Sequence, residues 1–337
     1  MKTNERSRQM DILKGIAILM IILTHYSFTD DQRHRMLFPF WIDQAVPVFM
    51  IVSGYVTTLA YKRRGIKTLR EGYEPKYKIA SMLRILLPFT YIFIVEIIVG
   101  FWKNGWSLRE LPLFIPKLYV IGGLGPGAYY VPLMIGMILI FPLLYLIIER
   151  FGFAGLWMIA VLNIVYELCR IRTGIPDNIE NCLIFRYMFV LSSGIWLASE
   201  KYVPHPLISA IGFIIGALFL YGVYYGGYQP VIFNQWSWSS AIACLYTIPI
   251  VGIVIKKGKG LHCGVLELLG KASFNIYLVQ KVWYYMLITF YAQEGSGRFY
   301  ILQRLALTYA VCIVIGLVFY KLESKSTKRI ISAVHLQ

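Results

Sequence analysis

Residues 79–101 read IASMLRILLPFTYIFIVEIIVGF and contain only two charged side chains, Arg84 and Glu96. A helix needs about 20 mostly apolar residues to cross roughly 30 Å of hydrocarbon, so this stretch is long enough to span a bilayer. The chain as a whole has the same character, since 58% of its 337 residues are hydrophobic and only 15% are charged. Soluble globular domains do not have this composition, which indicates an integral membrane protein.

Further apolar stretches predict an all-α, polytopic membrane fold with about ten transmembrane helices. The predicted spans are residues 12–28, 41–61, 79–101, 128–148, 154–168, 182–199, 206–226, 237–256, 271–292 and 299–321. Between two of them, Trp102–Gly127 mixes Pro and Gly with apolar residues, which favours an interfacial helix or a re-entrant loop. No polar segment is long enough to bury its own core, so we expect residues 1–337 to form a single membrane-embedded domain.

The net charge of +16 would suit a nucleic-acid ligand only if the basic residues formed a patch or stripe. They sort by side of the membrane instead. With the N-terminus inside, the inner segments carry most of the 33 lysines and arginines, and the densest run is Lys62–Lys78. The positive-inside rule and an even number of spans then place both termini in the cytoplasm. The Lys62–Lys78 run also suits the phosphates of a nucleotide-bearing cofactor. We expect no nucleic-acid partner.

Ionisable side chains at membrane depth are costly unless they face a partner or a wet cavity. The first predicted span holds Lys14 and His25, and Asp11 directly precedes it. Eleven residues at 100° each return to within about 20° of the starting face, so Lys14 and His25 share one stripe, roughly 16 Å apart along the axis. Histidine is the best general base here because its ordinary pKa lies nearest neutrality. The structural alternatives are a histidine that bonds a neighbouring helix and a lysine that extends to the headgroups.

Other spans contain polar residues that the bilayer disfavours, namely Arg84, Glu96, Glu167, Arg186, Gln280, Lys281 and Arg304. Several lie near predicted span ends, where long side chains reach the headgroups. Because of their predicted depth in the membrane, only Arg84 and Arg186 are retained from this set as candidate site residues. The five cysteines show no Cys-x-x-Cys or Cys/His cluster with metal-ligand spacing, so we expect no metal site.

Four segments, in this order, resemble the acyltransferase 3 family, whose membrane-embedded members O-acylate carbohydrates. They are MDILKGIAILMIILTH at Met10–His25, VPVFMIVSGY at Val46–Tyr55, GPGAYYVPLMIGMILIFPLL at Gly125–Leu144 and LLGKASFNIYLVQK at Leu268–Lys281. Together they extend over almost the whole chain.

The resemblance includes three departures from the usual family pattern. Lys14 stands where the family usually has Arg, ten residues before the retained His25. Lysine keeps the positive charge but lacks the planar fork that binds phosphate or carboxylate in two places. Arg84 stands four residues before Pro88, where a spacing of three is usual. Gln280 occupies the position where the late segment usually ends in His.

The resemblance implies transfer of an acyl group, most often acetyl, from acyl-CoA to a hydroxyl of a cell-envelope carbohydrate or glycolipid. It also implies a bacterial plasma membrane. His25 would be the catalytic base, with Lys14 and Arg84 as anion-binding groups and Asp11 orienting Lys14. The basic residues Arg63 and Arg64 would assist in binding the donor. The candidate substrate-cavity residues are Ser53, Tyr129, Tyr130, Ser273, Asn275, Tyr277, Gln280 and Arg186.

Two other classes of function share many of these features. A transporter or flippase also combines about ten spans with buried charges, but inverted repeats, which would support that class, are not visible in the sequence. A non-catalytic membrane partner is the third class. The retained His25 disfavours it.

Overall fold

The computed structural model describes residues 8–106, 111–199, 205–258, 260–287 and 298–333. Helices make up 81% of the structure, and no strand occurs among these residues. The all-α prediction is therefore confirmed.

Each predicted span mainly overlaps one α-helix, and residues 288–292 of the predicted span 271–292 lie outside the described part. The ten helices are α1 (Arg8–Thr24), α3 (Ala45–Arg64), α5 (Pro75–Asn104), α7 (Tyr130–Phe151), α8 (Phe153–Thr173), α10 (Met188–Leu197), α11 (Pro206–Tyr224), α12 (Ala241–Lys257), α14 (Ser273–Leu287) and α15 (Arg298–Ala333). In the described part of the chain, six spans are long and apolar enough to cross a membrane, and they contain α3, α5, α7, α8, α11 and α15. These six make the protein a multi-pass membrane protein, while the count of ten stays a prediction.

The remaining helices are short connections between the long ones. They are α2 (Asp30–Arg35), η1 (Phe38–Phe40), α4 (Leu69–Gly72), α6 (Leu111–Val120), α9 (Asp177–Glu180), η2 (Ile184–Tyr187), η3 (Ser237–Ser239) and α13 (Gly264–Lys271). The predicted span 182–199 is divided, because η2 precedes α10 and leaves it only 10 residues. The predicted span 154–168, the shortest of the ten, is part of the 21-residue helix α8.

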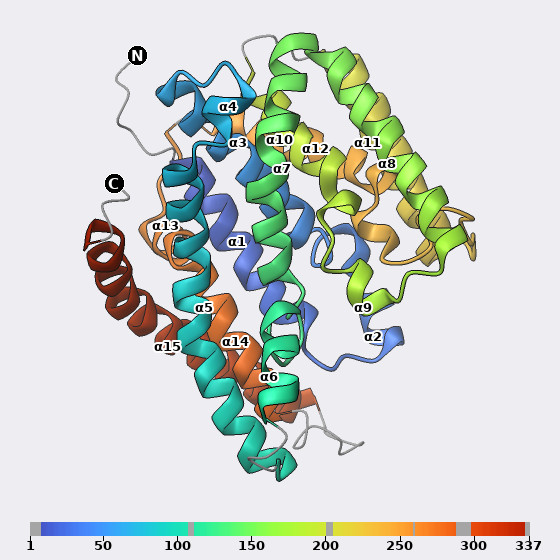
Figure 1. Cartoon of the computed structure of the whole chain (residues 1–337). Helices are drawn as coiled ribbons and strands as arrows, with labels where there is room; N and C mark the ends of the chain where they lie inside the picture. Colours follow the sequence, from blue (N-terminus) through green and yellow to red (C-terminus); the bar gives the residue numbers. More distant parts are fainter. Residues whose placement is uncertain (1–7, 107–110, 200–204, 259, 288–297, 334–337) are drawn as a thin grey trace.

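Helix α1 lies in the middle of the bundle, between outer helices α15 on one side and α8 and α11 on the other (Figure 1). It packs mainly against α13, α3 and α14. Glycine permits the closest of these contacts: a Cβ on Gly15 would lie 2.2 Å from the Leu266 carbonyl oxygen, and one on Gly270 would lie 1.8 Å from that of Asp11. Small residues allow membrane helices to approach to this extent. The two contacts fix α1 against α13 in antiparallel register.

The outer helices expose apolar side chains, as membrane-facing helices do. The most apolar windows of α11 and α15 are only 11% and 17% buried, whereas that of the span containing α3 is 56% buried. Helix α4, within the basic segment, lies at the upper end of Figure 1, and α2 and α6 lie lower. Which of these ends faces the cytoplasm stays a prediction from the charges.

Candidate functional site

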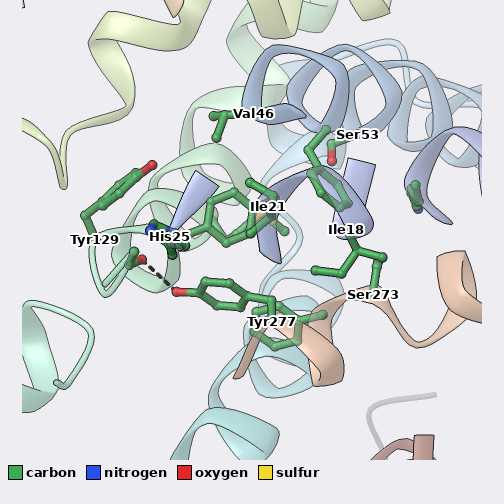
Figure 2. A pocket seen from close by; sticks show the side chains of 14 residues that line it. Ile18, Ile21, His25, Val46, Ser53, Tyr129, Ser273 and Tyr277 are labelled. Atoms are coloured by element: carbon green, nitrogen blue, oxygen red, sulfur yellow. Dashed lines mark hydrogen bonds between the residues drawn. The ribbon is translucent and has the colours of Figure 1, made fainter. Parts of the chain in front are cut away.

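A cavity of about 130 Å³ lies between α1, α3, α7 and α14. Its lining includes seven of the residues predicted from the sequence, which are Lys14, His25, Ser53, Tyr129, Tyr130, Ser273 and Tyr277. Most of the other lining residues are apolar, among them Ile18, Ile21 and Met134. In Figure 2, His25 and Tyr129 lie at one end of this cavity, and Ser53 and Ser273 lie at the other. The residues that the sequence singled out on four separate segments therefore meet at one place.

His25 directly follows the last residue of α1, and two tyrosines of α14 fix its surroundings. The Tyr277 hydroxyl donates a hydrogen bond of 2.7 Å to the Gly127 carbonyl, beside the imidazole (Figure 2). The Tyr284 hydroxyl donates one of 2.6 Å to the Ile22 carbonyl at the end of α1. The Tyr284 ring also meets the His25 ring edge-on, at 6.2 Å between centroids. These contacts hold the end of α1, and with it the imidazole, against α14.

The backbone on the other side of His25 is a glycine loop, residues 122–127, which joins α6 to α7. Gly127 adopts φ +81°, and a Cβ there would lie 3.2 Å from His25 Nε2 and 3.3 Å from Tyr277 Cε2. Only glycine adopts this conformation without strain and leaves that space open. The segment Trp102–Gly127 was predicted to form an interfacial helix or a re-entrant loop, and it contains α6 and this loop, with residues 107–110 outside the described part.

A buried ion pair between α5 and α14 holds the glycine loop. Lys281 Nζ lies 2.9 Å from Glu96 Oε1, and both side chains are 0% exposed. Lys281 also donates to the Gly122 carbonyl, and the Leu124 amide donates to Glu96 Oε2 at 2.9 Å. Each member of the ion pair thus makes a hydrogen bond to the glycine loop, Lys281 at Gly122 and Glu96 at Leu124.

Sequence reasoning did not retain Glu96 and Lys281 as candidates. Two signals were present: opposite charges on separate spans, and the run GGLGPG at residues 122–127. Neither signal says which helices are neighbours. The structure supplies that information.

Asp11 and Lys14 lie one turn apart near the start of α1. Lys14 lines the cavity, and its Cα lies about 16 Å along the helix axis from that of His25. Asp11 is buried at 3% exposure against α13, outside the lining of the cavity. The cavity therefore extends along the stripe from Lys14 to His25.

Three predicted cavity residues lie elsewhere. Asn275 Nδ2 donates to Glu323 Oε2 of α15 at 3.2 Å. Gln280 is fully buried, and both polar atoms of its side chain lack a hydrogen-bond partner among the described residues. Arg186 Nη1 lies 3.1 Å from Glu180 Oε2, and both side chains are almost completely buried. None of the three lines the cavity beside His25.

The predicted donor-binding arginines are also outside this cavity. Arg84 is exposed on the surface of α5, and Arg63 is exposed near the end of α3. Arg64 pairs with Glu74 at 2.6 Å, and its guanidinium lies 3.7 Å from the centre of the Tyr77 ring. A separate surface hollow in this region, of about 650 Å³, is lined by residues that include Lys62, Lys67, Glu149 and Arg150.

These features define a class of membrane protein in which one histidine faces a mostly apolar cavity between helices. Residues 7–320 match the family model described as an acyltransferase domain. The match covers most of the chain, and the chain belongs to the acyltransferase 3 family. It is therefore a membrane acyltransferase. No curated protein and no solved structure matches it.

Proposed function

We propose that the protein transfers an acyl group, acetyl above all, from acyl-CoA to a hydroxyl of a cell-envelope carbohydrate or glycolipid, with His25 as general base. The observation that carries this proposal is the cavity whose lining contains both Lys14 and His25. It brings a cation and a histidine, the side chain most often used as a general base, to one cavity. A bacterial plasma membrane is the proposed location.

In the proposed reaction, the acceptor hydroxyl gives its proton to His25 as its oxygen attacks the thioester carbonyl. A tetrahedral intermediate forms, its C–S bond breaks, and the departing thiolate receives the proton from His25. Negative charge develops on the carbonyl oxygen in the meantime. Helix α7 begins at Tyr130, directly after Gly127 and Tyr129 of the cavity lining, so its positive N-terminal end is directed at this region. Such an end stabilises an oxyanion.

The small size of the cavity supports a short acyl group. Ligand pockets commonly measure about 300–1,000 Å³, and this one measures about 130 Å³. It suits an acetyl thioester, whereas a nucleotide has to lie outside. Lys14 is the proposed anion-binding group at the donor end, with Asp11 orienting it. Arg63 and Arg64 are proposed secondary donor contacts, on the exposed surface.

The test is transfer of radiolabelled acetyl from acetyl-CoA to an envelope-glycan extract by purified protein in nanodiscs. His25→Ala is expected to lower acceptor-dependent transfer by about 10²–10⁴-fold, the usual contribution of a general base. His205→Ala, at the start of α11, is the matched control and is expected to retain activity. A folded His25→Ala variant with wild-type activity would exclude His25 as the base. Failure of the wild-type protein to transfer any acyl group across several donors and acceptors would favour the transporter or the non-catalytic partner.

A further inference from the structure

A second cavity, of about 320 Å³, lies beside α2 and η1. Its lining includes Asp30, Arg33, His34, Asp43, Tyr224 and Trp238. We propose that this cavity binds the acceptor as a neutral, hydroxyl-rich sugar unit. The inference rests on the proposed function and adds to it a site for the second substrate. None of these six residues was a candidate from the sequence.

The walls of the second cavity are fixed by contacts between segments far apart in the chain. His34 Nε2 lies 2.7 Å from the Tyr224 carbonyl oxygen, and the Tyr225 hydroxyl donates to the His34 carbonyl at 2.9 Å. The Gln44 amide nitrogen donates to the carbonyls of Pro39 at 2.7 Å and Trp238 at 3.2 Å. Helix α2 has its own capping box at Thr29. The cavity is thus preorganised, which lowers the entropy lost on binding a ligand.

Its charges favour a neutral ligand over an anion. Asp43 Oδ1 lies 3.1 Å from Arg33 Nη2, and the Asp43 side chain is only 3% exposed. The Arg33 guanidinium carbon lies 4.9 Å from the centre of the Phe38 ring, which orients it. Asp30 also lines the cavity, so the lining contains two carboxylates and one guanidinium. Carboxylates accept hydrogen bonds from hydroxyl groups, and the guanidinium donates to hydroxyl oxygens, so the set matches a sugar and repels a phosphate.

Aromatic rings give this cavity flat apolar faces. The rings of Tyr224 and Trp238 lie 6.2 Å apart, at 45° to one another. The C–H face of a sugar ring is apolar, and it packs on an aromatic surface while its hydroxyls reach polar groups at the edge. A carbohydrate needs this combination of a flat face and convergent hydrogen-bonding groups.

A row of aromatic side chains joins the second cavity to the cavity beside His25. Trp238 stacks on Trp236 at 6.1 Å and 25°, and Trp236 lies 4.9 Å from Tyr129, which lines the first cavity. Trp236 has φ 45°, a left-handed conformation that costs a non-glycine residue energy. The Arg186 guanidinium carbon lies 5.5 Å from the Trp236 ring. Arg186 therefore lies beside this row. Two ring contacts, through Trp236, thus connect the proposed sugar site at Trp238 with Tyr129 of the first cavity.

The experiment separates the acceptor site from the chemistry. Trp238→Leu and Asp43→Asn are compared with Trp157→Leu, which removes a 59% exposed tryptophan from α8. In nanodiscs, Trp238→Leu and Asp43→Asn are each expected to raise the acceptor KM about tenfold, through the lost ring face and the lost charged hydrogen bond respectively. The KM for acetyl-CoA is expected to stay unchanged in all three variants. Asp43→Asn keeps the side-chain shape and so controls for misfolding of the tryptophan variant.

Binding is measured without a donor as quenching of tryptophan fluorescence by the methyl glycosides of glucose, galactose and N-acetylglucosamine, with glucuronate as the anionic comparison. Saturable quenching by a neutral glycoside that Asp43→Asn weakens, with Trp238 still in place as the reporter, supports the site. Asp43→Asn is also expected to improve glucuronate binding relative to the neutral glycosides. An unchanged acceptor KM in both variants, or no saturable quenching by any glycoside, overturns the inference. If the wild-type protein transfers nothing, the proposed function fails, while the quenching measurement still tests the cavity.

Discussion

Replacing Lys281 by Met removes the cation from the buried pair that holds the glycine loop. The wild-type ammonium lies 2.9 Å from Glu96 Oε1 and also donates to the Gly122 carbonyl, with no exposed surface on either side chain. In the variant, the Glu96 carboxylate keeps its hydrogen bond from the Leu124 amide. Removing one partner of a buried ion pair costs about 3–5 kcal/mol, because the other charge is left uncompensated. We therefore expect Lys281→Met to lower the free energy of unfolding by about 3–5 kcal/mol.

A second change distinguishes the lost charge pair from a simple packing defect. Glu96→Gln combined with Lys281→Met removes both charges and leaves an acceptor for the Leu124 amide. The double variant is expected to lose only about 1–2 kcal/mol, mainly for the Gly122 carbonyl without its donor. Lys117→Met, on the exposed face of α6, is expected to stay within about 0.5 kcal/mol of the wild type. Equilibrium unfolding in detergent–SDS mixed micelles measures all three. A loss below about 1 kcal/mol in Lys281→Met, or a double variant less stable than the single one, would refute the reasoning.

Three further predictions concern the site and the topology. Gly127→Ala is expected to lower acyl transfer at least about tenfold, because its Cβ would lie 3.2 Å from His25 Nε2. Gly105→Ala is the control, since Gly105 also has a positive φ but lies in open space. It is expected to show only the backbone cost of about 1–2 kcal/mol. Lys14→Ala is expected to weaken acetyl-CoA use, measured as its KM, while Lys14→Arg retains it; an unchanged KM in Lys14→Ala would exclude donor binding. Cysteines placed in Lys62–Lys78 should react with an impermeant reagent only from the cytoplasmic side, and labelling from outside intact cells would reverse the topology.

The positions of the helices were predictable because apolar runs and their boundaries are local features. The predicted span 206–226 coincides with α11, which begins at Pro206 after the His205 cap. The predicted span 182–199 was less accurate, since buried Arg186 lies in the 3₁₀ helix η2 and α10 begins only at Met188. A hydropathy average does not resolve a change of helix type within an apolar run.

The candidate site was predictable only where one segment carries the signal. Lys14 and His25 share a stripe of α1, so their common cavity followed from helical geometry. Depth in the membrane did not indicate which side of a helix faces the protein. Arg84 was chosen on depth and is exposed, whereas Lys281 was set aside and is fully buried. Such distinctions depend on which helices are neighbours, and a single sequence does not contain that information directly.

The structure also separates the three departures from the family pattern by their distance from the proposed chemistry. Arg84 is exposed on α5, so its altered spacing from Pro88 changes a surface outside both cavities. Gln280 is fully buried outside the cavity lining, one residue before the Lys281 that holds the glycine loop. Lys14 alone lies in the lining with His25. A lysine binds an anion as a point charge, without the two-point grip of arginine. Of the three departures, only Lys14 therefore has a direct consequence for the reaction, at the end of the cavity proposed to bind the donor. The proposed base His25 and the proposed acceptor site are unchanged.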